Sequence, residues 1–186
     1  MSEPFHMQSA INETVERLEP QAGNALLEVA CGTGALLETL SRSTAGLRLT
    51  GVEASLAALA TARRRLGKSA GIRQGRAEQL PFPDQSFDLV VSVNALHGFP
   101  YQLGALMEMK RVLRTNGRLV ITDWCGDYPA CWLLDKWLRL TDSRHNRTLG
   151  HKAFRRLLQQ AGFSGIRIEH YRVNRIWGLM TARAAI

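Results

Sequence analysis

Hydrophobic and polar residues alternate along this chain with two different spacings. Leu26–Ala30 is a nearly continuous apolar run, as expected of a strand buried on both faces of a sheet. Ile11, Val15 and Leu18 recur at helical spacing instead, which indicates an amphipathic helix before that strand. Patterns of these two kinds predict helices over 7–19, 34–43, 55–66, 102–113, 130–141 and 151–161, and strands over 24–30, 47–52, 72–75, 87–93, 117–123, 165–171 and 175–183.

Strands that alternate with helices predict an α/β fold, with a mostly parallel sheet covered by helices on both faces. Turn and helix-end signals at Asn116-Gly117 and Gly162 agree with this reading. In open sheets of this kind, ligands bind beyond the carboxyl ends of the strands. We therefore expect one crevice surrounded by the residues at these ends: Gly32, Glu53, Ala77, Asn94 and Asp123.

A glycine-containing turn follows the first strand. Gly32 and Gly34 tolerate positive φ and carry no Cβ, so a ligand can approach the backbone closely there. The N–H groups that open the following helix attract an anionic or oxygen-rich group. A third glycine, which dinucleotide-binding turns use, is replaced by Leu37, and the chain has no phosphate-binding Gly-Lys-Ser/Thr string. The turn therefore predicts a nucleotide-like cofactor without a pyrophosphate.

An acidic residue ends the second predicted strand. Glu53 lies about twenty residues beyond the glycine turn, where a carboxylate can accept hydrogen bonds from both hydroxyls of a ribose. An alternative is that Glu53 only favours the N-terminus of the next helix. Because the glycine turn and the acid agree, we prefer the ribose-binding role.

Five motifs give this chain a family resemblance from about residue 24 to the C-terminus. They are Leu27–Gly34, Gly51–Ser55, Ala77–Val91, Arg111–Ile121 and Leu158–Phe163. The Leu-Pro-Phe-Pro-Asp-x-x-Phe-Asp string in the third motif is the most specific of them. In these motifs the chain resembles the class I S-adenosylmethionine-dependent methyltransferases, in particular the small-molecule group that includes the ubiquinone and menaquinone methyltransferases.

The resemblance implies a fold, a cofactor and a set of binding residues. The fold is a doubly wound, Rossmann-like, mostly parallel seven-stranded sheet with helices on both faces and an antiparallel last strand. The cofactor is S-adenosyl-L-methionine. Its implied contacts are Glu28, Ala30, Cys31, Gly32, Thr33 and Gly34 for the methionine and ribose, Glu53 for the ribose hydroxyls, Ala54, Ser55, Ala77 and Glu78 for the adenine, and Asn94 for the methionine end. For Glu28, a role in packing at the strand end is the alternative.

One position departs from the family pattern. The family usually has an acid in its third-strand motif that faces the adenine amino group, and this chain has Arg76 there. A guanidinium cannot accept a hydrogen bond. The adenine amine must then be bound by Glu78 or a backbone carbonyl, or the protein binds its cofactor weakly or lacks catalysis.

The loop after the fourth strand contains the best candidate for a general base. His97 is of the right chemical type and follows the strand that faces the reactive methyl group. Asp123, at the end of the fifth strand, is placed to orient a histidine or to meet the substrate. A histidine that only packs, and an aspartate that caps a turn, are the alternatives. His145 and His151 are weaker candidates.

Residues 124–150 lie where this family has a substrate lid. Tyr128 and Trp132 are the candidate substrate contacts, because aromatic side chains suit an apolar or aromatic acceptor. Packing of Trp132 and Trp137 in the core is the alternative. We expect one methyltransferase domain over 1–186, with an N-terminal helix within 1–20 and this short lid, acting as a monomer or homodimer.

Charge and cysteine content narrow the class of partner and compartment. The net charge is +8, which is compatible with an anionic substrate or lipid surface, although we prefer to interpret it as the solvated helix faces of a basic protein. The arginines are scattered, and Asn94–His97 does not match the Asn/Asp-Pro-Pro-aromatic string of base methylation, so nucleic acid is disfavoured. We expect reduced thiols in the cytoplasm, no secretory signal, no membrane span and, because Cys125 and Cys131 lack metal-ligand spacing, no metal site.

These observations favour methyl transfer from S-adenosylmethionine to a small, apolar or aromatic acceptor such as a quinone precursor, a lipid head group or a secondary metabolite. Two alternatives stay open. One is a non-catalytic protein that binds S-adenosylmethionine or S-adenosylhomocysteine, and the other, less favoured, is an RNA methyltransferase.

Overall fold

The computed structural model describes residues 5–142, 145–175 and 177–186. Residues 1–4 of the predicted N-terminal segment, residues 143–144 of the predicted lid and residue 176 of the predicted last strand lie outside the described residues. The elements in chain order are α1 (Phe5–Leu18), β1 (Ala25–Val29), α2 (Ala35–Ser43), β2 (Arg48–Glu53), α3 (Leu56–Leu66), β3 (Gly71–Gln74), β4 (Phe87–Val93), the short 3₁₀ helix η1 (Leu96–Gly98), α4 (Gln102–Val112), β5 (Leu113–Trp124), α5 (Pro129–Thr141), α6 (His151–Gln160), β6 (Ser164–Arg172) and β7 (Gly178–Ala185).

The strands form one seven-stranded sheet in the order β3-β2-β1-β4-β5-β7-β6. All pairs are parallel except those of β7, which runs antiparallel to both β5 and β6. The strand order reverses between β1 and β4, so the crevice of a doubly wound sheet is expected beyond the carboxyl ends of these two strands. The predicted fold class and the antiparallel last strand are confirmed.

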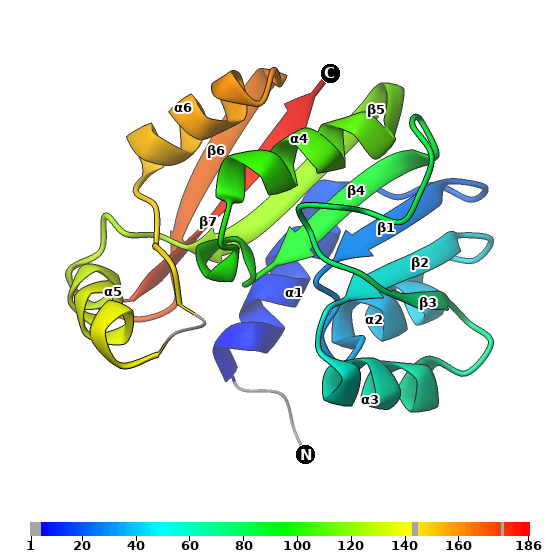
Figure 1. Ribbon diagram of the computed structural model, residues 1–186, viewed down its shortest axis with the longest axis horizontal. Coiled ribbons are helices and arrows are strands. Elements are labelled where there is room, and N and C mark those ends of the chain that lie inside the picture. Colours follow the sequence, from blue (N-terminus) through cyan, green and yellow to red (C-terminus); the bar gives the residue numbers. More distant parts are fainter. Residues whose placement is uncertain (1–4, 143–144, 176) are drawn as a thin grey trace.

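Helices cover the sheet on both faces. As Figure 1 shows, α1, α2 and α3 lie on one face, α4 and α6 lie on the other, and α5 lies to one side, beyond the end of the sheet where β7 begins. The strands β1 and β4 are buried almost throughout, which explains why their sequences are nearly continuous apolar runs. Among the described residues, no helix has the length and apolar character needed to cross a bilayer.

The glycine turn after β1 packs tightly against β2 and α2, and this packing holds the turn in place at the crevice. A Cβ at Gly51 would lie 2.8 Å from both Cys31 Sγ and Leu37 Cδ1, so only glycine fits there. Leu36, Leu37 and Leu40 of α2 are fully buried in the same core. Burial of each leucine side chain stabilises the fold by about 1.5–3 kcal/mol. The turn therefore packs against a buried part of the hydrophobic core.

The structure differs from the predicted elements mainly around β5. The strand begins at Leu113, directly after α4, although 117–123 was the predicted range. Its register against β4 shifts between the pairs Phe87–Leu113 and Leu89–Arg118, and Asn116 adopts φ 65° within this bulge. The turn predicted at Asn116-Gly117 is thus present, but as an irregularity inside the strand. The 3₁₀ helix after β4 was not predicted.

Candidate functional site

Two adjoining cavities lie at the carboxyl ends of β1, β2 and β4. The larger has a volume of about 700 Å³ and the smaller about 150 Å³, and both are lined by Ala30 and Ala95. The larger is within the size range of small-molecule sites. Its other lining residues include Val52, Glu53, Ala54, Ser55, Gly75, Arg76, Ala77, Glu78, Gly98, Phe99, Pro100, His145 and Asn146. The smaller is also lined by Met7, Ile11, Glu28, Cys31, Gly32, Thr33, Leu36 and Asn94.

The glycine turn brings bare backbone to the smaller cavity. Gly32 has φ 53°, and a Cβ built on it would meet no atom within 4 Å, so the space beside it is open. Gly34 has φ 82°, and a Cβ there would lie 2.7 Å from Leu66 Cδ1 of α3. Ala30 also has positive φ, 60°, although it is not glycine. Gly32 therefore leaves room for a ligand, whereas Gly34 allows α3 to pack against the turn.

Glu53 is held in a fixed orientation at the end of β2. Its Oε2 accepts a hydrogen bond from the Gly32 backbone N–H at 2.9 Å, and its Oε1 accepts one from the Ser55 N–H at 2.8 Å. Each carboxylate oxygen has a further acceptor position. The carboxylate therefore has one position on each oxygen for the two hydroxyls of a ribose, as the sequence predicts. Ser55 itself caps α3, because its hydroxyl accepts from the Ala58 N–H.

Two residues that line the smaller cavity each have a buried oxygen with no hydrogen-bond partner among the described residues. The oxygens are Glu28 Oε2 and Asn94 Oδ1. Asn94 has φ 50°, and its Nδ2 donates to Met7 Sδ of α1 at 3.7 Å. Burial raises the pKa of Glu28 well above its ordinary value, and the charge of Glu53 raises it further, against a hydrogen bond from the Leu37 backbone. Unpartnered buried oxygens are costly, so this cavity is suited to a ligand that donates hydrogen bonds.

Burial also keeps the Cys31 thiol neutral. It raises the pKa of this thiol, and the carboxylates of Glu28 and Glu53 add to the effect. Thr33, another predicted cofactor contact, accepts a hydrogen bond from Arg65 Nη1 of α3 at 3.1 Å. The hydroxyl thus anchors the turn to α3. Cys31 and Thr33 both line the smaller cavity, and their contact with the cofactor stays a prediction.

Arg76, which stands where the family usually has an acid, lies at the rim of the larger cavity. Its side chain is 67% exposed, and its Nε lies 3.5 Å from Glu78 Oε2. Glu78 is half-buried in the same cavity wall, with Ala77 buried beside it. The pair therefore leaves a carboxylate at the cavity edge, and this carboxylate is one of the two groups offered in place of the usual acid.

His97 and Asp123 form a hydrogen-bonded pair at the ends of β4 and β5. His97 Nδ1 lies 2.6 Å from Asp123 Oδ1, and the His97 backbone N–H donates to Asp123 Oδ2 at 2.8 Å. Burial disfavours the charged ring, but Asp123 and Asp135 outweigh it and raise the pKa of His97 above its ordinary value. Asp123 is buried and also accepts from the Trp124 N–H. This arrangement orients the ring and leaves Nε2 as the atom available for proton transfer.

Aromatic rings surround His97. It stacks on Trp124 with centroids 4.4 Å apart and lies 5.3 Å from the ring of His145, which lines the larger cavity. His145 Nε2 in turn lies 2.8 Å from Asp135 Oδ1 of α5. Among the described residues, Ala95 and Gly98 line the larger cavity. His97, which lies between them in the sequence, does not. His145, which is a weaker candidate from the sequence alone, therefore lines the larger cavity itself.

The two predicted substrate contacts lie in different surroundings. The Tyr128 ring packs over Gly178, where an added Cβ would come within 2.1 Å of Cε2, and it contacts the core. Trp132 is 52% exposed on α5, with Lys136 Nζ 4.0 Å from its ring centroid. Neither belongs to the described lining of the larger cavity. Their role in acceptor binding stays a prediction.

Sequence reasoning missed several lining residues. Met7 and Ile11 of α1 line the smaller cavity, and Phe99 and Asn146 line the larger one. The amphipathic pattern of α1 indicated only that Ile11 faces the protein. Asn146 reaches the site because its Nδ2 donates to the Phe99 carbonyl at 2.7 Å, a contact over 47 positions that no local pattern reveals.

Comparisons with known proteins agree with this geometry. A family model described as a methyltransferase domain matches residues 27–121. Among curated relatives, the phthiotriol/phenolphthiotriol dimycocerosates methyltransferase 1 of Mycobacterium ulcerans is 38% identical over 103 residues, covering 55% of this chain and 38% of the relative. The demethylmenaquinone methyltransferase of Tropheryma whipplei is 36% identical over 104 residues, covering 55% of this chain and 43% of the relative. These matches therefore span less than half the length of the relatives.

A solved structure shows the same fold at low sequence identity. Phosphoethanolamine N-methyltransferase 2 of Haemonchus contortus, in complex with S-adenosyl-L-methionine, superposes with a TM-score of 0.80 at 15% identity, over 95% of this chain and 52% of the other. The predicted fold is confirmed by this likeness, and the predicted family and its cofactor, S-adenosylmethionine, by the family model. Because that model covers half of the chain, the chain belongs to the methyltransferase domain family.

Proposed function

We propose that this chain transfers a methyl group from S-adenosylmethionine to a small, apolar or aromatic acceptor. The observation that carries the proposal is the division of the crevice into two adjoining cavities that suit the two ends of this cofactor. Glu53 lines the larger cavity, which we assign to the nucleoside, and Glu28 and Asn94, each with an unpartnered buried oxygen, line the smaller one.

The residues present fit the cofactor chemically. A methionine end carries an ammonium group, which supplies the donors that Glu28 Oε2 and Asn94 Oδ1 lack. The open backbone at Gly32 leaves room for the cofactor, while its N–H holds Glu53 in place for the ribose hydroxyls. Glu78 takes the adenine amino group, with Arg76 beside it at the rim. The bound cofactor supplies an electrophilic methyl group on a sulfonium.

His97 is the proposed general base. For a hydroxyl, amine or carbon acid, the acceptor must lose a proton, and the Nε2 of a ring whose Nδ1–H is held by Asp123 is suited to take it. Asp123 then stabilises the imidazolium that forms. The raised pKa of His97 makes it a stronger base than an ordinary histidine. Because the ring is stacked on Trp124, its orientation is fixed before the acceptor arrives.

The character of the acceptor follows from α5 and the lid that we assign to 124–150. Leu133, Trp137 and Leu140 on α5 are 64%, 58% and 88% exposed, beside the half-exposed Trp132. The helix is tied to the site because Asp135 binds His145. An apolar surface of this kind, next to the basic Lys136 and Arg139, suits an apolar acceptor presented at an anionic lipid surface. The names of the relatives, which cite a lipid and a quinone, support the same class.

The three cysteines and the two apolar clusters support two further proposals, a cytoplasmic location and a single domain. All three cysteines are free, as expected of a protein in the reducing cytoplasm. The two apolar clusters lie on opposite faces of one sheet, which supports a single domain over 1–186.

A specific observation keeps the non-catalytic alternative open. Arg76 stands where the family usually has an acid, and a protein that only binds the cofactor tolerates such a change. Incubation of the pure protein with methyl-labelled S-adenosylmethionine and fractionated lipid and quinone extracts tests the two. The proposal expects label in an apolar product with wild type and at least about 100-fold slower labelling with His97→Ala. Cofactor binding without labelled product from any fraction supports the non-catalytic alternative.

A further inference from the structure

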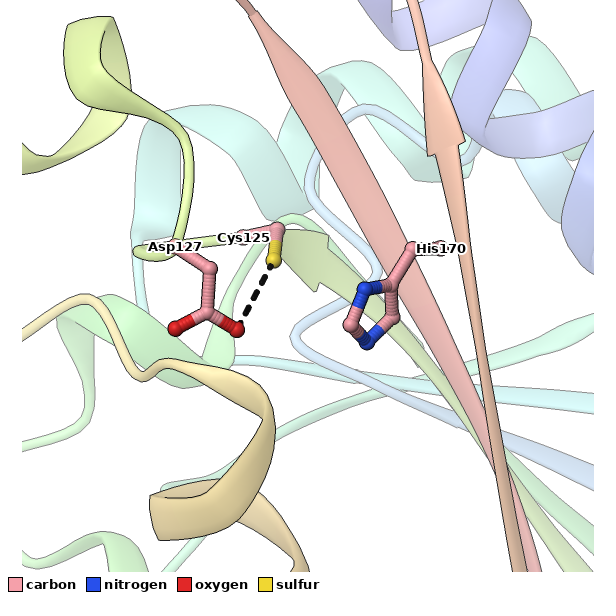
Figure 2. Close-up of side chains that lie close together, drawn as sticks. All are labelled: Cys125, Asp127 and His170. Carbon is pink, nitrogen blue, oxygen red and sulfur yellow. Dashed lines mark hydrogen bonds between the residues drawn. The ribbon is translucent and has the colours of Figure 1, made fainter.

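A second cluster of reactive side chains lies outside the cofactor crevice. Cys125 follows β5 directly, Asp127 lies in the loop before α5, and His170 lies on β6, 43 or more positions further along the chain. Their ligand atoms, Cys125 Sγ, one Asp127 carboxylate oxygen and one His170 ring nitrogen, all lie within 4.8 Å of one another. Figure 2 shows the three side chains converging on a common point.

Strand pairing brings these residues together. β7 lies between β5 and β6, and its residue Met180 pairs with both Asp123 and His170. The Cys125 N–H donates to the Gly178 carbonyl at the start of β7. Since paired residues point to the same side of a sheet and alternate residues share a face, Cys125 and His170 project from the same face across β7. Spacing in the sequence gives no sign of this, which is why the thiols were expected to hold no metal.

Three further contacts surround the cluster. Asp127 Oδ2 accepts the His151 backbone N–H at 2.8 Å, so its carboxylate is held in place. The His151 ring meets that of His170 edge to face, with centroids 4.7 Å apart, and its buried Nε2 has no hydrogen-bond partner among the described residues. Cys125 donates its S–H to Asp127 Oδ2 at 3.7 Å, so a replaceable proton lies between two ligand atoms.

We propose that Cys125, Asp127 and His170 bind a divalent transition metal ion of the zinc type. A thiolate, a carboxylate and an imidazole nitrogen are the donors that Zn²⁺ prefers, whereas Mg²⁺ and Ca²⁺ favour oxygen donors throughout. One thiolate and one carboxylate neutralise the charge of a divalent ion, so the filled site carries no net charge. The fourth position of a tetrahedral ion is left to water.

The ion would fasten the start of the lid to the far edge of the sheet. Asp127 precedes α5, and His151 begins α6, while His170 belongs to the edge strand β6. Asp127 and His170 are exposed, so the ion has a route from solvent. Cys125 also lies two positions from Asp123, which holds His97. A metal here would therefore stiffen the part of the chain that carries the proposed base without touching the reacting groups.

Metal titration tests this site directly and independently of methyl transfer. Chelator-treated full-length protein is titrated with Zn²⁺ against a chromophoric competitor, and with Co²⁺ to detect absorption from a thiolate ligand. Wild type is expected to bind one ion per chain. Cys125→Ser and His170→Gln each weaken the Kd by more than about 100-fold, beyond what loss of an outer partner costs. Cys131→Ser is the matched control, because this neighbouring buried thiol donates to the Gly178 carbonyl instead.

The outcomes separate a built site from adventitious binding. Equal affinity in wild type, Cys125→Ser and His170→Gln, or no saturable binding in wild type, overturns the proposal. Thermal unfolding in chelator checks that the variants fold. If Cys125→Ser does not fold, His170→Gln remains decisive, because its exposed side chain leaves the core intact. Since neither cofactor nor acceptor is present, failure here says nothing against the proposed methyl transfer.

Discussion

The proposed site has two halves, one for the cofactor and one for the acceptor, and they are built in different ways. The cofactor half consists of the β1 turn and the end of β2, and its central contact joins Gly32 to Glu53, 21 positions apart. The acceptor half joins His97 to Asp123, then to Trp124 and His145, through side-chain and ring contacts among separate elements. In the proposed function, local backbone geometry therefore specifies where the cofactor would bind, whereas tertiary packing specifies where the proton would go. Variants in one half should leave the other half working.

Loss of the proposed base should have the largest effect. His97→Ala is expected to lower kcat by about 10²- to 10⁴-fold, the usual contribution of a positioned acid or base. The Kd for S-adenosylmethionine should change by less than about twofold, because His97 is not among the described lining residues of the larger or the smaller cavity. Turnover is measured with labelled methyl donor and affinity by calorimetry. A large loss of cofactor affinity would contradict the separation of the two halves.

The pH profile sharpens the same prediction. Since the pKa of His97 is raised, its neutral, proton-accepting form appears only at a pH above that of an ordinary histidine. The acid limb of kcat/KM should therefore lie above about pH 6.5, the ordinary value. Removal of the negative charge in Asp123→Asn should lower the pKa and move this limb to lower pH, together with slower turnover. An acid limb that stays in place would show that Asp123 does not tune the base.

Crowding of the glycine turn should disable the cofactor half. Gly32→Val fills the open space beside the turn, and it is expected to weaken the S-adenosylmethionine Kd by about 100-fold or more, ~2.8 kcal/mol. Gly67→Val is the matched control, because Gly67 has the same φ of 53° and equally open surroundings at the end of α3. Both variants place a side chain at the same positive φ, so calorimetry should find weak binding only in Gly32→Val. Equal losses would mean that strain, not the site, is responsible.

Replacement of the buried carboxyl should separate stability from binding. Glu28→Gln is expected to weaken cofactor affinity by about 10- to 100-fold, the contribution of a hydrogen bond to a charged group, 1.5–3 kcal/mol. The cofactor-free variant should instead be more stable at neutral pH by more than ~1 kcal/mol, because the wild-type carboxyl must either take up a proton or stay charged when folding buries it.

The pH dependence of that stability has a definite sign. The folded-state pKa of Glu28 is raised, so the folded protein binds more protons than the unfolded chain between the two pKa values. The free energy of unfolding of wild type therefore falls as the pH rises above the unfolded value, about 4.3. Denaturant unfolding should show that the advantage of Glu28→Gln vanishes below this pH. An advantage that persists at lower pH would rule out the ionisation of Glu28 as its cause.

The smallest expected effect concerns the outer face of α5. Leu140→Glu should reduce binding to anionic lipid vesicles by about tenfold, because a leucine that enters the lipid contributes roughly 1.5–3 kcal/mol. Leu56→Glu, at an exposed leucine on α3, is the control. Vesicle sedimentation measures both. Equal binding by the two variants would exclude α5 as the lipid-facing surface.

Much of this architecture could be predicted from the sequence, and the comparison of the two halves explains which part. The buried strands β1 and β4, the glycine turn and Glu53 depend on local patterns, and they lie where expected. His145 was ranked low because only folding brings residues 135 and 145 to His97. The convergence of Cys125 and His170 depends on β7 running between their strands, which no spacing reveals.

Binding of the cofactor at Glu53 tests the central claim most directly. Calorimetry with S-adenosylmethionine is performed on wild type, on Glu53→Ala, and on Glu16→Ala, which removes an exposed carboxylate of α1. Wild type and Glu16→Ala should bind one cofactor per chain with equal Kd, and Glu53→Ala should bind at least about tenfold more weakly, because both ribose acceptors are lost. Absence of binding by wild type, or equal affinity in all three proteins, would contradict the account.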